Sequence, residues 1–313
     1  MTAIVTLTFN PAIDKSTSVP ILIPEKKMSC TAPIYEPGGG GVNVARALKK
    51  LGAEATAIYL AGGNTGEMYT QLLVKEAVTT LVVPTKGNTR ENFIVEETQT
   101  NKQYRFGLPG AQISEQEWQL CLTELEKMTE ISFIVVSGSI PPGIPENIFS
   151  KISAIAQAKK AKLVVDTSGE ALKHAIKAGV YLIKPSLGEL AMLVGMENLP
   201  AEQVAQSARK VIEQGNCEVV VVSMGAAGAM LVTKELAIKV KAPEVKIRST
   251  VGAGDSMVAG IVLSLMKNPS LKTALQYGVA CGTAATVNLG TGLCDKEFVE
   301  EIYQIILNEA TKE

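Results

Sequence analysis

Short runs of consecutive apolar residues alternate along the chain with segments of helical period. The apolar runs lie at residues 3–7, 55–60, 132–137, 161–166, 181–184 and 218–223. Runs of this length without regular polar positions are typical of strands that are covered on both faces. Helical patterns at 42–51, 146–159 and 201–214 separate several of them, and Gly52 marks the expected end of the first helix. This order predicts an α/β fold, a three-layer sandwich with a mostly parallel central sheet.

Two segments depart from this alternation. Residues 15–35 are extended, contain prolines and have no helical period, whereas residues 91–106 suggest a hairpin around a polar turn at 99–102. We expect the two segments, about 15–36 and 89–107, to pair as a small second sheet. A sheet rooted in the loops of a larger one is suited to a lid or a dimer contact.

Composition restricts the classes of function that need consideration. The 313 residues are 46% hydrophobic, and we expect them to form a single domain spanning 1–313. The formal net charge of -1 gives no electrostatic basis for nucleic-acid or membrane-surface binding. The beginning of the chain has the pattern of a strand and not of a signal peptide, and no apolar stretch is long enough to span a membrane. We therefore expect a soluble, cytoplasmic protein.

Histidine and cysteine chemistry is nearly excluded. His174 is the single histidine, so a histidine-based triad or a multi-histidine metal site cannot form, and we expect it on the surface or in packing. The five cysteines form no CxxC pair, and their odd number disfavours a disulfide framework. We expect them to be buried or inert thiols in a reducing compartment.

The segment most suggestive of chemistry is a glycine-rich turn at 249–256 that runs directly into an apolar helix. Small residues at Gly252, Ala253 and Gly254 would leave backbone N–H groups bare at a helix N-terminus, where an anion is favoured. The carboxylate of Asp255 would lie at the same place. This combination suits phosphoryl transfer to a hydroxyl group, with aspartate as the base. The alternative is an aspartate-capped helix behind a tight turn.

A second glycine-rich segment covers residues 37–46. Four glycines in succession cost backbone entropy but let a ligand approach the main chain closely. Asn43 is the polar group that we expect to face such a ligand. The alternative is a flexible loop leading into a helix that is capped near Asn43.

Further candidates follow the predicted strands. Asp14 closes the first strand, where open α/β sheets bind ligands, and Arg90 and Arg105 flank the hairpin and are suited to a phosphate. The loops 137–143 and 223–228 also follow strands. The P-loop pattern GxxxxGK[ST], the dinucleotide fingerprint and the protein-kinase loop are all absent from the sequence.

These segments together resemble the PfkB family of carbohydrate kinases over essentially the whole chain. Residues 249–260 are similar to its C-terminal signature, and the glycine run before Asn43 is similar to its N-terminal signature. The runs at 103–111, 137–143 and 165–172 are similar to the branch of minor bacterial 6-phosphofructokinases. The resemblance implies a ribokinase-like fold with a small β lid, and ATP-dependent transfer of phosphate to the 1-hydroxyl of fructose 6-phosphate.

The resemblance also implies roles for individual residues. Asp255 would be the base, and the backbone of Gly252, Ala253 and Gly254 would form the anion hole. The sugar phosphate would be bound by Asp14, Gly39, Asn43, Ser139, Arg90, Arg105 and Lys27, the last of these reaching from a partner subunit. The nucleotide would be bound by Lys184, Ser186, Ser223, Gly225, Gly228 and Thr250.

Metal ions and oligomeric state are implied in the same way. Mg²⁺ would accompany ATP, with Glu189 organising its water ligands. A monovalent cation, K⁺, would lie at Ser249, Val251, Asn288 and Gly290. The small sheet would serve as lid and homodimer interface, and the only other partners implied are ATP and the sugar phosphate.

Several positions depart from the family pattern. Ser186 stands where the family commonly has the asparagine of Asn-x-x-Glu, which weakens the implied nucleotide and metal contacts. Ile23 and Ser29 stand where the branch carries an aromatic and a further basic residue, so a regulatory second ATP site is not carried over.

The sequence leaves several activities open. Residues 8–14 also resemble tagatose-6-phosphate kinases and 1-phosphofructokinases, although the four-glycine run favours the 6-phosphofructokinase. A nucleoside kinase is disfavoured by Arg90 and Arg105, which suit a substrate that already carries phosphate. A non-catalytic sugar-phosphate sensor is disfavoured by the intact segment from Gly252 to Asp255.

Overall fold

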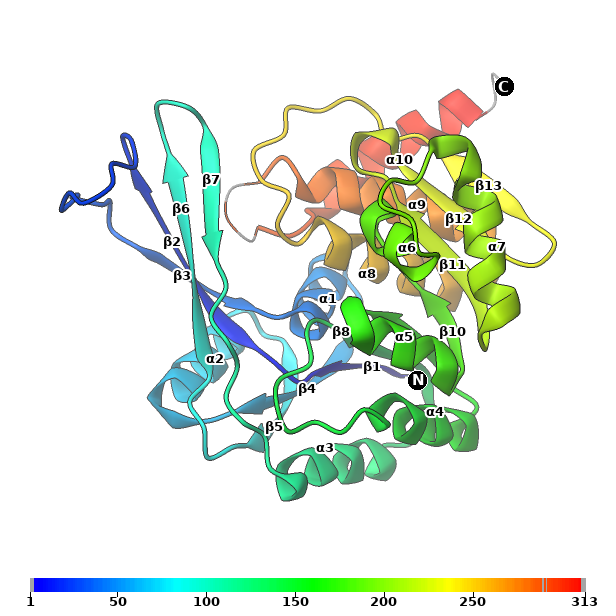
Figure 1. The fold of residues 1–313 in the computed structure, drawn as a ribbon, viewed down its shortest axis with the longest axis horizontal. Coiled ribbons are helices and arrows are strands. Elements are labelled where there is room, and N and C mark those ends of the chain that lie inside the picture. Colours follow the sequence, from blue (N-terminus) through cyan, green and yellow to red (C-terminus); the bar gives the residue numbers. More distant parts are fainter. Residues whose placement is uncertain (1–2, 289, 291, 311–313) are drawn as a thin grey trace.

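A nine-stranded sheet runs through the middle of the molecule in the computed structural model, which describes residues 3–288, 290 and 292–310 (Figure 1). The strand order is β13-β12-β11-β10-β9-β8-β1-β4-β5, with β12 and β13 antiparallel at one edge and parallel pairing elsewhere. The strands are β1 (Ala3–Thr8), β4 (Ala55–Ala61), β5 (Thr79–Pro84), β8 (Ile131–Ser137), β9 (Lys162–Asp166), β10 (Val180–Ile183), β11 (Cys217–Ser223), β12 (Ala229–Val232) and β13 (Ala237–Val240).

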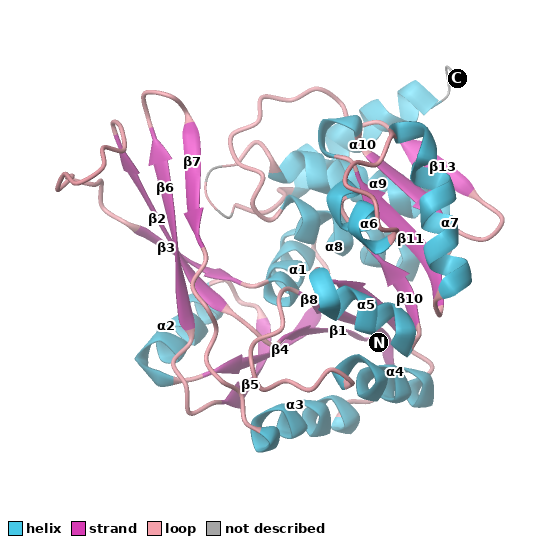
Figure 2. Cartoon of the chain, in the orientation of Figure 1, coloured by secondary structure: helices cyan, strands magenta, loops and turns pink. Residues whose placement is uncertain are grey.

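Helices cover both faces of this sheet and complete a three-layer sandwich, as the sequence predicts (Figure 2). The helices on one face are α1 (Gly40–Lys50), α2 (Gly63–Lys75), α8 (Ala253–Lys267), α9 (Leu271–Ala285) and α10 (Lys296–Ala310). Those on the other face are α3 (Glu115–Lys127), α4 (Ile148–Lys159), α5 (Gly169–Ala178), α6 (Leu187–Leu193) and α7 (Val204–Gln214).

The strands contribute to both cores because their side chains alternate between the two faces. In β8, Phe133 and Val135 pack into one hydrophobic cluster, whereas Ile134 and Val136 pack into the other. This double burial explains why the strand sequences are continuous apolar runs, and it confirms the strand assignments made from them. Among the described residues, no helix is long and apolar enough to cross a membrane.

A second sheet of four strands stands beside the first (Figure 1, left). Its order is β3-β2-β6-β7, formed by β2 (Ala12–Val19), β3 (Ile34–Gly38), β6 (Arg90–Glu97) and β7 (Lys102–Phe106). The extended segment and the hairpin therefore do pair, through the parallel register of β2 with β6.

Two details differ from the sequence-based expectations. The glycine run is not a loop, because Gly38 ends β3 and α1 already begins at Gly40, so the helix start is not near Asn43. A side chain at Gly40 would meet the Ser137 hydroxyl at 2.2 Å, and one at Gly41 would meet the Leu7 carbonyl oxygen at 2.4 Å. The glycines thus let α1 pack tightly against the strand ends. Separately, Cys30 is exposed, while the other four cysteines are buried.

Candidate active site

The start of α8 lies at the carboxyl edge of the large sheet and is shaped by a glycine in a left-handed conformation. Gly252, the N-cap residue, has φ +74°, and a Cβ there would come within 2.6 Å of a Leu293 methyl group. Among the residues that the structure describes, no side chain caps this helix, which leaves its first N–H groups available to an anion. The anion hole expected at Gly252, Ala253 and Gly254 is therefore sterically open.

Asp255 lies in the first turn of α8 and is held by two donors. Asn43 Nδ2 donates to its Oδ2 at 3.0 Å, and Ser137 Oγ donates to its Oδ1 at 3.2 Å. Burial raises the pKa of Asp255 to about 6, with a further contribution from the negative charge of Asp166, while the Asn43 hydrogen bond opposes the rise. A carboxylate with a pKa slightly below neutrality is suited to general-base catalysis.

A buried ion pair lies next to this carboxylate. Lys184 Nζ is 3.3 Å from Asp166 Oδ1, and both groups are close to Gly254, whose missing Cβ would lie 3.3 Å from Lys184 Nζ. Burial disfavours the charged lysine, but the hydrogen bond and charge of Asp166, together with the charges of Asp255 and Glu189, outweigh it, and the pKa of Lys184 is raised. A permanent positive charge is thus fixed beside the helix N-terminus, where phosphate groups would carry negative charge.

Next to Asn43, Asp14 and the glycine run form a polar cluster, which is the expected sugar recess. Asn92 Nδ2 donates to Asp14 Oδ1 at 2.8 Å. A Cβ on Gly38 would lie 2.3 Å from Asp14 Oδ2, so only glycine allows this carboxylate its position. Gly39 follows with φ +113°, and burial raises the pKa of Asp14. The three residues expected to hold the sugar therefore lie next to one another: Asp14, Gly39 and Asn43.

Arg90 lies at the edge of that recess. Its Nη1 donates to the Leu108 carbonyl at 2.9 Å and its Nη2 to the Asn10 carbonyl at 3.2 Å. Its Nε is buried and has no hydrogen-bond partner among the described residues. The guanidinium as a whole is only partly buried, and such a group beside the sugar-binding residues suits a phosphate. Ser139, another expected sugar contact, accepts a hydrogen bond from Asn10 Nδ2 at 2.9 Å.

The other two cationic residues expected to bind the sugar phosphate, Arg105 and Lys27, belong to the small sheet and its connections. Arg105, on β7, donates through Nη2 to Thr250 Oγ1 at 3.0 Å, so it bridges the small sheet and the turn before α8. Lys27 is exposed in the connection between β2 and β3. In the described part of the chain, no hydrogen bond or ion pair joins Lys27 to Asp14, Asn43 or Arg90.

A pocket of about 440 Å³ lies on the opposite side of Gly254 from the sugar recess. It is lined by four of the expected nucleotide-binding residues, Ser223, Gly225, Gly228 and Thr250. Apolar side chains such as Val245, Ile247 and Val279 form much of the rest. Such a lining suits the flat face of a purine base, with its phosphates directed toward α8.

Ser186 and Glu189 lie at the start of α6 and form a capping box. Ser186 Oγ accepts from the backbone N–H of Glu189 at 3.3 Å, and Glu189 Oε2 accepts from that of Ser186 at 2.7 Å. Glu189 also faces Asp166 and Lys184 electrostatically. The carboxylates of Glu189 and Asp166 beside the expected ATP phosphates suit Mg²⁺ that is held through its water ligands. The described residues contain no cluster of three or more metal-ligating side chains that would bind the ion directly.

The residues expected around a monovalent cation come together in two adjacent loops. Ser249 Oγ donates to the Gly290 carbonyl at 2.9 Å and accepts from the Val251 backbone N–H at 3.2 Å. Asn288 Nδ2 donates to the Leu293 carbonyl at 2.9 Å. Backbone carbonyls and a hydroxyl are oxygen ligands of the kind that suits a hard cation such as K⁺.

Sequence reasoning assigned no role to several side chains that organise this site, although Ser137 begins the candidate loop 137–143. Asp166, Asn92 and Ser137 contact Lys184, Asp14 and Asp255 respectively. Asp166 and Ser137 end strands β9 and β8, so their position at the carboxyl edge was the one available signal. Asn92 lies within a strand and carried no signal at all.

Comparison with known proteins places the chain in a family. The model of the pfkB family of carbohydrate kinases matches residues 6–297. The ATP-dependent 6-phosphofructokinase isozyme 2 of Escherichia coli is 43% identical over 304 residues, which are 97% of this chain and 98% of that protein. Two crystal structures of the E. coli phosphofructokinase-2 cover 98% of this chain and 100% of theirs. The complex with potassium has 42% identity and a TM-score of 0.93, and the complex with fructose-6-phosphate has 40% identity and a TM-score of 0.92. The signatures, the ribokinase-like fold and these matches agree, and the chain belongs to the pfkB family of carbohydrate kinases.

Proposed function

We propose that this protein is an ATP-dependent 6-phosphofructokinase, which transfers the γ-phosphate of ATP to the 1-hydroxyl of fructose 6-phosphate. The observation that carries the proposal is the position of Asp255. It lies in the first turn of α8, where it contacts Asn43 on one side, and the preceding residues Ala253 and Gly254 line the pocket. The 43% identity to the E. coli isozyme over nearly both chains supports the choice of substrate.

The chemical step follows from this placement. Asp255 takes the proton of the sugar 1-hydroxyl as its oxygen attacks the γ-phosphorus, and the bond from that phosphorus to the β-bridging oxygen breaks to release ADP. The free N–H groups at the start of α8 and the ammonium of Lys184 stabilise the negative charge on the transferred group. Mg²⁺, when bound with ATP, neutralises phosphate charge, and Glu189 would orient its water ligands. Arg90 and Arg105 would hold the 6-phosphate away from the reacting centre.

The product identifies the reaction. We expect ³¹P NMR of a turnover mixture to show a second phosphomonoester on fructose 6-phosphate, and aldolase to cleave the product, as it does fructose 1,6-bisphosphate. Plain fructose should be a poor acceptor, because it has no phosphate for Arg90 and Arg105 to bind. A product phosphorylated elsewhere, or equal turnover of fructose, would contradict the proposal.

We further propose that residues 1–313 act as one kinase domain whose lid is formed by about 15–36 and 89–107. One face of the small sheet points toward the loops next to α8. Arg105 on this face donates to Thr250, and a Cβ on Gly290 would lie 3.8 Å from Ser16 Oγ. Arg105, Ile94 and Ser16 are aligned across β7, β6 and β2.

The opposite face of the lid carries exposed aromatic residues and suits a homodimer. Phe106, Phe93, Lys15 and Tyr35 are aligned across the four strands, and Lys15 Nζ lies over the rings of Tyr35 and Phe93. Phe106 is 51% exposed and Phe93 is 39% exposed. A face of this kind, on a sheet that also borders the active site, is typical of an interaction surface. A partner would also bring the second copy's Lys27 within reach.

Light scattering tests this part of the proposal. We expect the wild type to be dimeric and Phe106→Glu to be monomeric, because a carboxylate would be buried against the partner. Leu120→Glu, at an exposed apolar position on α3, serves as the matched control and should remain dimeric. A monomeric wild type would refute the homodimer, and an unchanged Phe106→Glu dimer would place the interface elsewhere.

A further inference from the structure

The guanidinium of Arg46 is buried next to the glycine run and contacts Asn43, one of the expected sugar-binding residues. Arg46, on α1, is only 4% exposed. Its Nη1 donates to Asn43 Oδ1 at 3.1 Å and to the Pro37 carbonyl at 2.7 Å. Its Nε and Nη2 donate to the two carboxylate oxygens of Glu76, both at 2.7 Å. Every one of these acceptors belongs to the protein, so Arg46 is fully engaged inside the fold.

The contact with Asn43 determines which way its amide points. A guanidinium can only donate hydrogen bonds, so the amide atom that faces Arg46 must be the oxygen. The amide nitrogen then faces the opposite side, where it donates to Asp255 Oδ2 at 3.0 Å. A flipped amide would direct an NH₂ group at the guanidinium and an oxygen at the carboxylate, and both contacts would be repulsive.

We propose that Arg46 is a positioning residue, which fixes the amide of Asn43 so that its nitrogen faces the catalytic carboxylate of Asp255. The inference rests on the proposed role of Asp255 as base. It gives the arginine within the glycine-rich segment a task in catalysis, although it touches neither sugar nor nucleotide.

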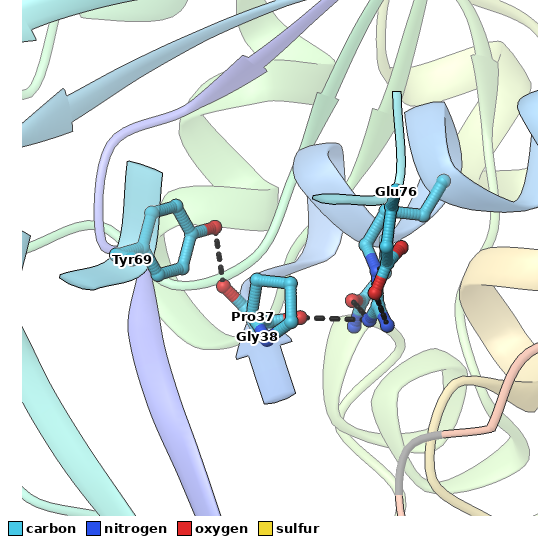
Figure 3. Close-up of polar contacts among 6 residues, drawn as sticks. Pro37, Gly38, Tyr69 and Glu76 are labelled. Carbon is cyan, nitrogen blue, oxygen red and sulfur yellow. Dashed lines mark hydrogen bonds and ion pairs between the residues drawn. The ribbon is translucent and has the colours of Figure 1, made fainter. Parts of the chain in front are cut away.

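The same network holds the main chain of the recess. Figure 3 shows Glu76 beside the guanidinium and the Tyr69 hydroxyl directed at the Gly38 carbonyl, to which it donates at 2.7 Å. Arg46 and Tyr69 thus fix successive carbonyls at the end of β3. These contacts orient the glycines that approach the ligand, and they account for a fully buried tyrosine at this place.

The location of Glu76 is itself informative. It is the C-cap residue of α2, where the helix dipole disfavours a carboxylate. The bidentate pair with Arg46 compensates for this cost and locks the plane of the guanidinium. The arginine therefore presents Nη1 to Asn43 in a single orientation.

Other charges around Asp255 remain in place when Arg46 is altered. Asp166 and Lys184 face Asp255 from the ends of β9 and β10, and Ser137 donates from the end of β8. None of these groups contacts Arg46 in the described part of the chain. A change in the titration of Asp255 on altering Arg46 would therefore be transmitted through Asn43.

The test is the pH dependence of kcat/KM in the double variant Arg46→Met/Glu76→Leu, which removes the ion pair without leaving a lone charge. The Asn43 amide then loses its preferred orientation, and the Asp255 carboxylate loses the hydrogen bond from Asn43 Nδ2. Because that bond stabilises the ionised form, the acidic limb of the profile should move upward by about one pH unit. Arg46→Lys, which keeps a donor, should restore the wild-type limb. The profile is measured with whichever sugar phosphate gives the highest kcat/KM, so an error in substrate identity leaves this test intact.

Two controls separate positioning from general damage. Lys49→Met/Glu54→Gln removes another ion pair, exposed near the end of the same helix, and should leave the limb unmoved. In an Asn43→Ala background there is no amide to orient, so Arg46→Met/Glu76→Leu should produce no additional shift.

An unmoved limb in a folded double variant would overturn the proposal, and so would a further shift in the Asn43→Ala background. If the double variant does not fold, Arg46→Gln takes its place. A glutamine amide either donates or accepts, so it no longer dictates the orientation of Asn43. The limb should move in the same direction, and a wild-type profile in that variant would equally refute the proposal.

Discussion

Replacing Asp255 with asparagine should remove activity and at the same time stabilise the protein. Asparagine has the shape of aspartate, and the surroundings can satisfy its amide. Its oxygen can accept from Asn43 Nδ2, and its nitrogen can donate to Ser137 Oγ, because a hydroxyl accepts as readily as it donates. The recess should therefore keep its geometry while losing its base.

Both magnitudes follow from the structure. A general base contributes about 10²–10⁴ to turnover, so kcat should fall by about 10³ in Asp255→Asn. Burial and Asp166 raise the pKa of Asp255 from 3.8 to about 6. Since the folded state then binds the proton more tightly than the unfolded state, the ionised carboxylate destabilises the fold at pH 7, by at most about 3 kcal/mol. The neutral amide relieves this cost, and Tm should rise by several degrees.

The sign of the pH dependence gives an internal check. The destabilisation by Asp255 is fully present above about pH 6 and disappears below pH 3.8, where the carboxyl is protonated in both states. The gain in Tm of Asp255→Asn should therefore shrink as the pH falls from 7 to 4. Differential scanning calorimetry over that range measures it, alongside kcat from coupled ADP release.

Asp295→Asn is the matched control, because Asp295 caps α10 through acceptor bonds that asparagine also makes. It should leave kcat and Tm unchanged. A kcat of Asp255→Asn within tenfold of the wild type would refute the assignment of the base. A fall in Tm would refute the argument that the site is destabilised by burial of charge.

Three further outcomes are expected. The acidic limb of the wild-type kcat/KM profile should lie near pH 6, because Asp255 acts only when ionised, and a flat profile from pH 5 to 8 would contradict this. Arg90→Ala should raise KM for the sugar phosphate by about 10–100-fold while KM for ATP stays within twofold, because the guanidinium would bind the sugar's phosphate and not the nucleotide. An unchanged KM would move the phosphate site elsewhere. Gly252→Ala should lower Tm and kcat together, since φ is +74° and the added methyl would lie 2.6 Å from Leu293, and a fully active, equally stable variant would exclude a strained turn.

Much of the fold was predictable because burial on both faces leaves a clear signal in each strand. The apolar run at 132–137 became β8, with residues alternating between the two cores. The antiparallel edge, β12 and β13, was not predicted at all. The two strands are only four residues long, and β13 contains Lys239 and is mostly not buried, so it lacks the continuous apolar run of a central strand.

The candidate site was predictable where chemistry is local in sequence. Gly252 to Asp255 combine a turn, a helix start and a carboxylate within four residues. The supporting contacts were not predictable, because they join residues far apart in the chain. Asn43 and Asp255 are separated by 212 positions, and Arg46 and Glu76 by 30. No spacing rule relates such residues before the fold brings them together.

The glycine run illustrates the limit of local reasoning. Four glycines suggest a flexible loop, yet they end a strand and begin a helix. Tertiary contacts decide this, because Gly38 makes room for Asp14 and Gly40 for Ser137. The close approach of a ligand to this backbone stays a prediction, whereas the close approach of other protein atoms was not foreseen.

The most direct test of the central claim compares three sugar phosphates in one assay. ADP release from MgATP is followed with fructose 6-phosphate, tagatose 6-phosphate and fructose 1-phosphate, each with and without K⁺. The account predicts the highest kcat/KM for fructose 6-phosphate, and faster turnover with K⁺. A preference for either other sugar would contradict the proposed substrate, and absence of turnover on all three would contradict the assignment of this site as a sugar-phosphate kinase.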